Sequence, residues 1–254
     1  MKFLILKKHT LLMALLLIVV TTLLCVPFGA NSASSVFFGD NLRKVPIYNV
    51  QTEEKKVAIS FDAAWGADKT LGIIENLKEY KCGATFFLVG FWVEDYPEEA
   101  KKVVENGFEI GTHSNTHPDM VKLSAEQMKL ELSTSIEIIE NTTGISPKLF
   151  RAPFGSYNNT LLDTAEELGL KTIQWDVDSL DWKGISAGEI CNRITTRVKN
   201  GSIILCHNNS KHILDALPLV LEKLLMQGYT VCSVGDLVYD DNYIIDRAGV
   251  QKKL

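Results

Sequence analysis

Short apolar runs alternate with helical patterns along most of the chain, and this alternation restricts the folds that the chain can adopt. Each run is short enough to be a strand, and the runs are rich in Val, Ile, Leu and Phe. Because the runs are predominantly apolar, we expect strands that are buried on both faces of a parallel sheet. The strands are expected at residues 57–61, 84–89, 108–112, 149–151, 172–175, 202–206 and 229–233.

Amphipathic segments separate these runs. Ser124 with Gln127 has the pattern of a capping box, and Pro97 suits the first turn of a helix. Seven strands in roughly 185 residues are too few for a full eight-fold barrel, which needs about 250 residues. The expected fold class is therefore α/β, a distorted, incomplete (β/α) barrel of about seven strands. Helices are expected at residues 68–80, 97–106, 124–142, 159–168, 186–199 and 215–227.

The N-terminus has the layout of a targeting segment. Lys2, Lys7 and Lys8 precede an uncharged apolar stretch at residues 10–28, as in a signal peptide or an uncleaved signal anchor. We expect residues 1–33 to form that segment, with an anchor favoured over cleavage, so the catalytic part lies outside the cytoplasm. The further divisions expected are a tether at 34–54, the main domain at 55–235 and a peripheral C-terminal tail at 236–254.

Charge and cysteine content narrow the class of protein. The net charge is −5 among 254 residues, which argues against nucleic acid as a partner. The cysteines beyond the N-terminal segment form no Cys-x-x-Cys pair, so neither a zinc knuckle nor a redox motif is supported. We expect buried thiols, with a disulfide between Cys206 and Cys232 as the alternative.

Ionisable residues recur where the expected strands end. Asp62 follows the run at 57–61, His113 and His117 follow the run at 108–112, and His207 follows the run at 202–206. Carboxyl ends of parallel strands meet at one edge of a sheet, so these side chains are expected to share a site. Two neutral imidazoles from one turn are suited to a divalent metal. Taken singly, each residue has an ordinary explanation, such as a core histidine or a helix cap.

Five short motifs in order resemble the polysaccharide deacetylases with a NodB-type domain, carbohydrate esterase family 4. The resemblance covers roughly residues 55 to 235 and is strongest to the branch found in spore-forming bacteria. The motifs are Ser60-Phe61-Asp62-Ala63-Ala64-Trp65-Gly66, His113-Ser114-Asn115-Thr116-His117, Arg151-Ala152-Pro153-Phe154-Gly155, Asp178-Ser179-Leu180-Asp181-Trp182 and Ile203-Ile204-Leu205-Cys206-His207.

The resemblance implies a distorted barrel and metal-assisted hydrolysis of an N-acetyl group on a sugar. It assigns the metal to His113 and His117. It makes Asp62 the general base and Arg151 the residue that orients it. Zinc is the expected metal, with cobalt or manganese as alternatives. This chemistry is reasonable, because a metal polarises an amide carbonyl and lowers the pKa of bound water.

The remaining roles concern the leaving amine and the acetyl group. The resemblance implies that Asp181 holds His207 protonated, so that His207 acts as the general acid. Trp182 and Leu205 would form the slot for the acetyl methyl, and the backbone N–H of Phe154 would help to bind the oxyanion. An amine leaves poorly as an anion, so an acid of near-neutral pKa suits the reaction.

One position departs from the family pattern. Ala63 stands where the family usually has a second Asp, which is the third metal ligand. Catalytic zinc sites normally have three protein ligands. Three outcomes stay open: waters or a nearby group complete the shell, Asp62 moves in as a ligand, or the metal binds too weakly for useful turnover.

The sequence therefore predicts a metal-dependent hydrolase that removes N-acetyl groups from cell-wall polysaccharide, either peptidoglycan or a related N-acetylglucosamine polymer. The alternatives are a catalytically silent glycan-binding protein and an esterase for O-acetylated polysaccharide. We expect a monomer that is anchored in the membrane or secreted to the cell wall, and the resemblance suggests a role in sporulation. Trp65 and Trp92 are candidates for a sugar groove or for the core, and the charges at 126–140 favour a solvated helix face.

Overall fold

The computed structural model describes residues 43–254 of the chain. The predicted targeting segment at 1–33 and the first part of the tether lie outside the described residues. Within the described part, no helix combines the length and apolar character that crossing a membrane requires.

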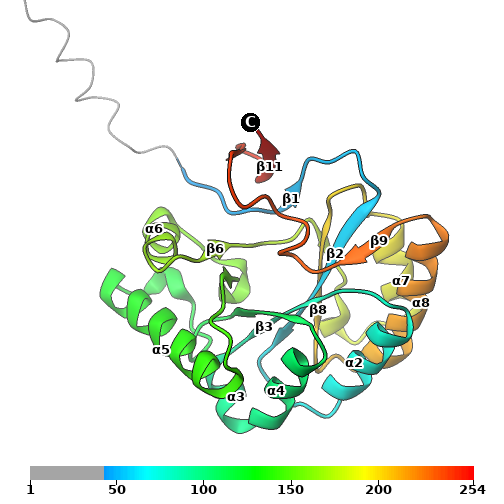
Figure 1. Cartoon of the computed structure of the whole chain (residues 1–254), viewed down its shortest axis with the longest axis horizontal. Coiled ribbons are helices and arrows are strands. Elements are labelled where there is room, and N and C mark those ends of the chain that lie inside the picture. The colour runs from blue at the N-terminus through cyan, green and yellow to red at the C-terminus, as the bar shows by residue number, and fades with distance from the viewer. Residues whose placement is uncertain (1–42) are drawn as a thin grey trace, which may run out of the picture. The chain divides into compact units, whose positions relative to one another are not determined.

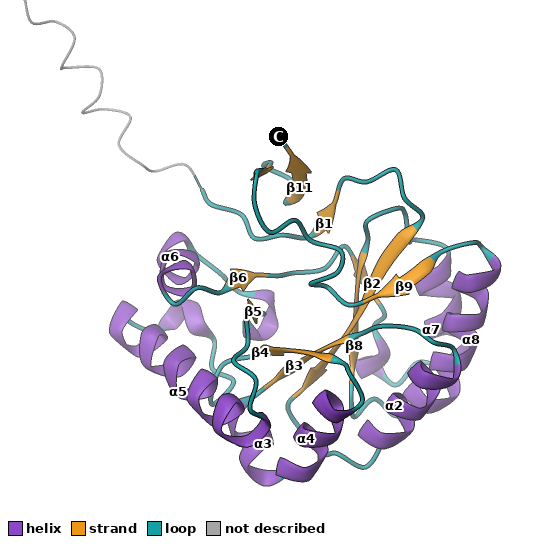
Figure 2. Ribbon diagram, viewed as in Figure 1, coloured by secondary structure: helices purple, strands orange, loops and turns teal. Residues whose placement is uncertain are grey.

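A curled parallel sheet forms the centre of the fold (Figure 2). Its strand order is β6-β5-β4-β3-β2-β8-β7, and β9 also pairs with β2. The predicted α/β class and incomplete barrel are confirmed. The strands are β2 (Lys56–Ala63), β3 (Thr85–Leu88), β4 (Glu109–Thr112), β5 (Leu149–Phe150), β6 (Lys171–Thr172), β7 (Val177–Asp178), β8 (Ile203–His207) and β9 (Thr230–Cys232). The two-residue strand β7 was not predicted, because so short a run has no detectable alternation.

Helices surround the outer face of this sheet in an arc (Figure 1). Ser124 and Gln127 form the predicted capping box, and Pro97 lies in the first turn of its helix. The short helix α3 was not predicted, since six residues are too few to show a helical period. The helices are α2 (Thr70–Glu79), α3 (Gly90–Asp95), α4 (Pro97–Glu105), α5 (Ala125–Thr143), α6 (Asn159–Glu167), α7 (Ala187–Thr195) and α8 (Ile213–Met226), with 3₁₀ turns η1 (Met120–Lys122), η2 (Pro153–Gly155) and η3 (Asp181–Lys183).

The main core lies between the sheet and the helices. Central strand β2 is buried from Val57 to Ala63, as expected for a strand covered on both faces. Trp92 belongs to this core and has no exposed surface. Its indole N–H donates to the carbonyl of Gly66 at 2.7 Å. Of the two explanations open for Trp92, the structure therefore supports core packing.

The segments expected to be a tether and a peripheral tail meet in a second, smaller sheet. Strand β1 (Asn49–Val50) pairs in parallel with β11 (Val250–Lys253), which pairs antiparallel with β10 (Tyr243–Ile245). Ile47 and Val50 are almost fully buried, so residues from 43 onward belong to the same compact unit as the rest. These strands are too short and too mixed in polarity to be recognised in the sequence.

The thiols of Cys82, Cys191, Cys206 and Cys232 are free and buried. The alternative of a disulfide between Cys206 and Cys232 was wrong. Both residues pair with β2, but Cys206 lies opposite Phe61 and Cys232 lies opposite Ala58. The two thiols are therefore at different heights along the same strand.

Candidate active site

The ionisable residues predicted to share a site do meet at the carboxyl edge of the sheet. Asp62 near the end of β2 and His207 at the end of β8 are register partners on neighbouring strands. They border a cavity of about 650 Å³. Arg151 lies behind Asp62 and has no exposed surface. The other predicted site residues line the cavity: Asp62, His113, His117, Phe154, Asp181, Trp182, Leu205 and His207.

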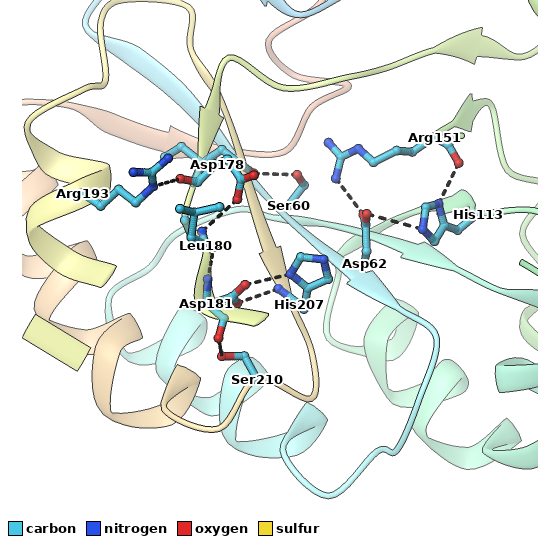
Figure 3. A network of polar contacts seen from close by, with 12 residues as sticks. Ser60, Asp62, His113, Arg151, Asp178, Leu180, Asp181, Arg193, His207 and Ser210 are labelled. Atoms are coloured by element: carbon cyan, nitrogen blue, oxygen red, sulfur yellow. Dashed lines mark hydrogen bonds and ion pairs between the residues drawn. The ribbon is translucent and has the colours of Figure 1, made fainter. Parts of the chain in front are cut away.

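Asp62 is held by a buried cation. Its Oδ1 accepts a hydrogen bond of 2.8 Å from Nη1 of Arg151 (Figure 3). The guanidinium lies 4.1 Å from the ring centroid of Phe87 and donates to the carbonyl of Gln174 at 3.3 Å. Burial alone would raise the pKa of Asp62, but the charge of Arg151, with smaller effects of His113 and His207, lowers it overall. Asp62 is therefore an ionised carboxylate at neutral pH.

His207 is held by a second carboxylate. Asp181 accepts from Nδ1 of His207 at 2.7 Å and from its backbone N–H at 2.8 Å (Figure 3). Ser210 donates to the carbonyl of Asp181. Burial would lower the pKa of His207, but the hydrogen bond and charge of Asp181 raise it overall. This partner fixes the ring and keeps a proton available on it.

The imidazoles of His113 and His117 follow β4. In the sheet order, β4 and β8 lie on opposite sides of β2, which carries Asp62. Nδ1 of His113 bonds to the carbonyl of Arg151 at 2.7 Å, and Nε2 lies 3.5 Å from Oδ2 of Asp62. The two imidazole centroids are 4.9 Å apart. Burial is the largest cause of the lowered pKa of both residues, and together with the charge of His113 it lowers the pKa of His117 to about 4. Neutral imidazoles are the form that binds divalent metals.

Neutral imidazoles are suitable metal ligands, but two of them are fewer than the three protein ligands of a usual catalytic zinc site. Deacetylases of the family that this site resembles are generally metal-dependent. Among residues 43–254, however, no group of three His, Cys, Asp or Glu side chains is arranged to hold a metal ion. Ala63 has no exposed surface and packs in the main core. The protein therefore offers two imidazoles, and Asp62, the nearby carboxylate, is already paired with Arg151.

The loops that carry the site hold unusual backbone conformations. Six non-glycine residues of the described chain have positive φ, and four of them are in these loops: Ser114 (69°), His117 (57°), Phe154 (61°) and Leu180 (55°). Such conformations cost about 1–3 kcal/mol in unfavourable cases and persist where surrounding contacts impose them. Here the hydroxyl of Ser114 accepts from the backbone N–H of His117 at 3.0 Å. The loops are thus built to hold these side chains in place.

Glu131 on α5 is a residue that the sequence did not reveal. Its carboxylate accepts from the backbone N–H groups of Asn115 and Thr116 at 2.9 and 2.8 Å, and from the Thr116 hydroxyl at 2.6 Å. The charges at 126–140 had favoured a solvated face, and this position is an exception. Nothing in the sequence marks it, because only packing of α5 beside the loop brings it there.

Replacing Glu131 by Ala should loosen the loop between His113 and His117. We expect the free energy of unfolding to fall by about 1–3 kcal/mol, since hydrogen bonds to a charged group are lost. Zinc affinity should fall by about tenfold, because the two imidazoles lose their fixed spacing. Urea unfolding and zinc titration measure these effects. Glu137→Ala, on an exposed part of the same helix, is the matched control, and equal effects of the two variants would refute the role of Glu131.

Comparison with known proteins identifies the family. The family model described as polysaccharide deacetylase matches residues 49–173. A peptidoglycan-N-acetylglucosamine deacetylase of Bacillus cereus is 32% identical over 196 residues, which cover 75% of this chain and 92% of the relative. The chain belongs to the polysaccharide deacetylase family. The resemblance inferred from the five ordered motifs of this polysaccharide deacetylase family member is therefore confirmed, as is its predicted fold.

Other members of the polysaccharide deacetylase family are longer than this chain. An uncharacterised protein of Bacillus subtilis, YlxY, is 33% identical over 78% of this chain, which spans 62% of YlxY. The chain spans 41% of the peptidoglycan-N-acetylglucosamine deacetylase of Listeria monocytogenes, at 32% identity. The similarity therefore concerns the deacetylase domain and not the whole length of these relatives.

Solved structures add a contrast within the family. The wild-type form of a carbohydrate esterase family 4 pseudoenzyme from Bacillus anthracis has a TM-score of 0.75 and 31% identity, covering 84% of this chain and 72% of that one. A mutant of that pseudoenzyme with restored enzymatic activity has the same TM-score and 32% identity. The fold of this chain is thus shared by an inactive family member and by a reactivated one.

Proposed function

We propose that this chain hydrolyses N-acetyl groups on cell-wall polysaccharide, peptidoglycan or a related N-acetylglucosamine polymer, and releases acetate. The observation that carries the proposal is a pair of ionisable side chains on adjacent strands, each held by a partner of opposite charge. Asp62 is kept ionised by Arg151, and His207 is held by Asp181. Binding a glycan needs neither a base nor an acid with its own orienting partner, whereas amide hydrolysis needs both.

In this proposal Asp62 takes a proton from the attacking water, and Arg151 keeps its carboxylate in place. His207 gives a proton from its ring to the nitrogen of the leaving amine, while Asp181 stabilises the protonated ring. The sugar's acetyl methyl would contact Leu205 and Trp182, which both line the cavity. The backbone N–H of Phe154 would donate to the oxygen that gains charge.

A divalent metal, zinc in the first instance, would be held by His113 and His117. When bound, it would supply a positive charge that polarises the acetyl carbonyl and lowers the pKa of bound water. The neutral state of both imidazoles supports this assignment. The ligand position that Ala63 leaves unfilled would be taken by water.

We further propose that the reaction takes place outside the cytoplasm. Relatives are named as deacetylases of peptidoglycan, a cell-wall polymer, and residues 1–33 have the composition of a signal anchor or signal peptide. A monomer, attachment to the membrane through that segment and a role in sporulation complete the proposal. They follow from the sequence and from the resemblance to the branch of spore-forming bacteria.

A second candidate is a glycan-binding protein without turnover. The observation that favours it is Ala63, whose methyl group is sealed in the core where the family pattern has a metal ligand. A solved structure with this fold, from Bacillus anthracis, is described as a pseudoenzyme of carbohydrate esterase family 4.

Acetate release from peptidoglycan and from N-acetylchito-oligosaccharides tests the proposal. The full chain is assayed after chelation and again with added zinc, cobalt or manganese. We expect no release after chelation and restored release with metal. Release should fall as the pH rises through the raised pKa of His207, because the acid is then deprotonated. At acid pH, protonation of Asp62 should limit release only below the usual range of aspartate, since the pKa of Asp62 is lowered.

Three outcomes would contradict all or part of the proposal. Glycan binding without acetate release under any metal would favour the second candidate. Faster cleavage of O-acetyl esters than of N-acetyl amides would instead favour a polysaccharide esterase. A metal-independent release would mean that His113 and His117 have another role.

A further inference from the structure

Exposed aromatic rings gather at the cavity. Within residues 43–254 the large exposed aromatic side chains are Trp65, Phe154 and Trp182, at 57%, 69% and 58% exposure. All three line the cavity at the carboxyl edge of the sheet. An indole left in water forgoes the burial that would stabilise the fold. Three such rings at one site, with none of this size elsewhere on the described surface, indicate a surface that is covered when a ligand binds.

Trp65 is the ring that the proposed mechanism does not use. It follows β2 in a short loop whose next residue, Gly66, has φ of 64°. The carbonyl of Gly66 accepts from the indole N–H of Trp92 at 2.7 Å and from Nδ2 of Asn208 at 2.9 Å. Both donors belong to buried residues. Hydrogen bonds from buried residues therefore hold the loop in place, and the exposed Trp65 side chain extends from it.

The position of Trp65 is set by two neighbouring rings. Its centroid lies 4.8 Å from that of His117 and 6.4 Å from that of Phe91. Phe154, in the turn η2 that follows β5, packs on His117 with their ring centroids also 4.8 Å apart. Trp65 and Phe154 thus flank His117 and form an aromatic edge of the cavity. Trp182 follows β7, which lies on the other side of β2 in the sheet order. Aromatic side chains therefore line the cavity from both sides of β2 in the sheet order.

We propose that Trp65 is the platform for a second sugar ring, next to the sugar whose N-acetyl group reaches Asp62. The inference rests on the proposed function and deepens it: the site takes a linear, N-acetylated oligosaccharide rather than a single sugar. A sugar ring has an apolar face of C–H groups, which packs on an indole while its hydroxyls stay hydrated. Trp65 lines the same cavity as Asp62, so a sugar ring packed on the indole would lie next to the sugar that is hydrolysed.

Binding measured without turnover tests this subsite. The full chain is titrated calorimetrically, in the presence of a chelator, with N-acetylglucosamine and with its β-1,4-linked tetramer. The wild type should bind the tetramer about tenfold more tightly than the monomer, a difference of about 1.4 kcal/mol. Trp65→Ala should remove this preference and leave monomer affinity unchanged. Trp65→Phe should keep most of it, because a smaller ring still offers a face.

The matched control is Met226→Ala, which removes an exposed apolar side chain from α8. It should change neither affinity, and thermal unfolding checks that each variant is folded. Equal affinity of the wild type for monomer and tetramer, or an unchanged preference in Trp65→Ala, overturns the subsite. In either case acetate release by the wild type, assayed with metal, still supports the proposed function. Tetramer selectivity without any acetate release would support the subsite and refute the activity.

Discussion

Replacing Asp62 by Asn should reduce acetate release by about 10²- to 10⁴-fold, the range expected for losing a positioned general base. Asn has nearly the same shape, and its oxygen can still accept the hydrogen bond that Arg151 donates. What disappears is the negative charge and the ability to take a proton. Initial rates of acetate release on N-acetylglucosamine tetramer, at saturating metal, measure the loss.

Asp68→Asn is the control for this experiment. Asp68 lies in the loop after β2 with a largely exposed side chain, and among residues 43–254 its ion-pair partner is neighbouring Lys69. Its substitution should leave the rate within a factor of about two, as for most surface changes. If Asp62→Asn retains wild-type activity while the control does too, Asp62 is not the base. Thermal unfolding of both variants separates a catalytic loss from a structural one.

Introducing a carboxylate at the missing ligand position should have the opposite effect. We expect Ala63→Asp to raise zinc affinity by about 10- to 100-fold and acetate release by at least about tenfold, because a third protein ligand completes a catalytic zinc site. Without metal the variant should be less stable by about 1–3 kcal/mol, since a carboxyl group enters a sealed core. Thermal unfolding with and without zinc, together with metal titration, measures both changes.

Ala64→Asp is the matched control, one residue further along. Ala64 is also nearly buried and lines the cavity, but the family pattern has its third metal ligand at position 63 and not at position 64. A carboxylate there should not reproduce the gain in zinc affinity. If Ala63→Asp binds zinc no better than the wild type, the lost carboxylate does not explain the short donor set. A gain in affinity without a gain in rate would place the defect outside the metal site.

The positions of the catalytic candidates could be predicted because they follow from topology. Asp62, His113 and His207 each end a strand-like run, and parallel strands bring such ends together. Buried strands such as β2 and β8 leave a strong signal, since most of their residues are apolar. The roles came from the motif resemblance, since spacing alone left a core histidine or a helix cap as alternatives.

What escaped prediction depends on contacts between distant segments. Glu131 has the composition of a solvated helix residue, yet packing of α5 turns it towards the loop at residues 115–116. The pairing of β1 with β11 joins residues about two hundred positions apart and involves only two rungs. Local sequence does not distinguish Trp65 from Trp92, but only Trp92 packs in the main core. Such features have no local period and become visible only in three dimensions.

The register between Asp62 and His207 has a consequence for how such a site changes over evolutionary time. The two residues are opposite each other on hydrogen-bonded neighbouring strands. The spacing between their backbones is therefore retained wherever the sheet is retained. A lineage that loses a metal ligand in a loop or at a strand end therefore keeps the proton-transfer pair intact. Loss of activity by this route removes only a metal ligand, so a single later substitution that restores the ligand reverses it.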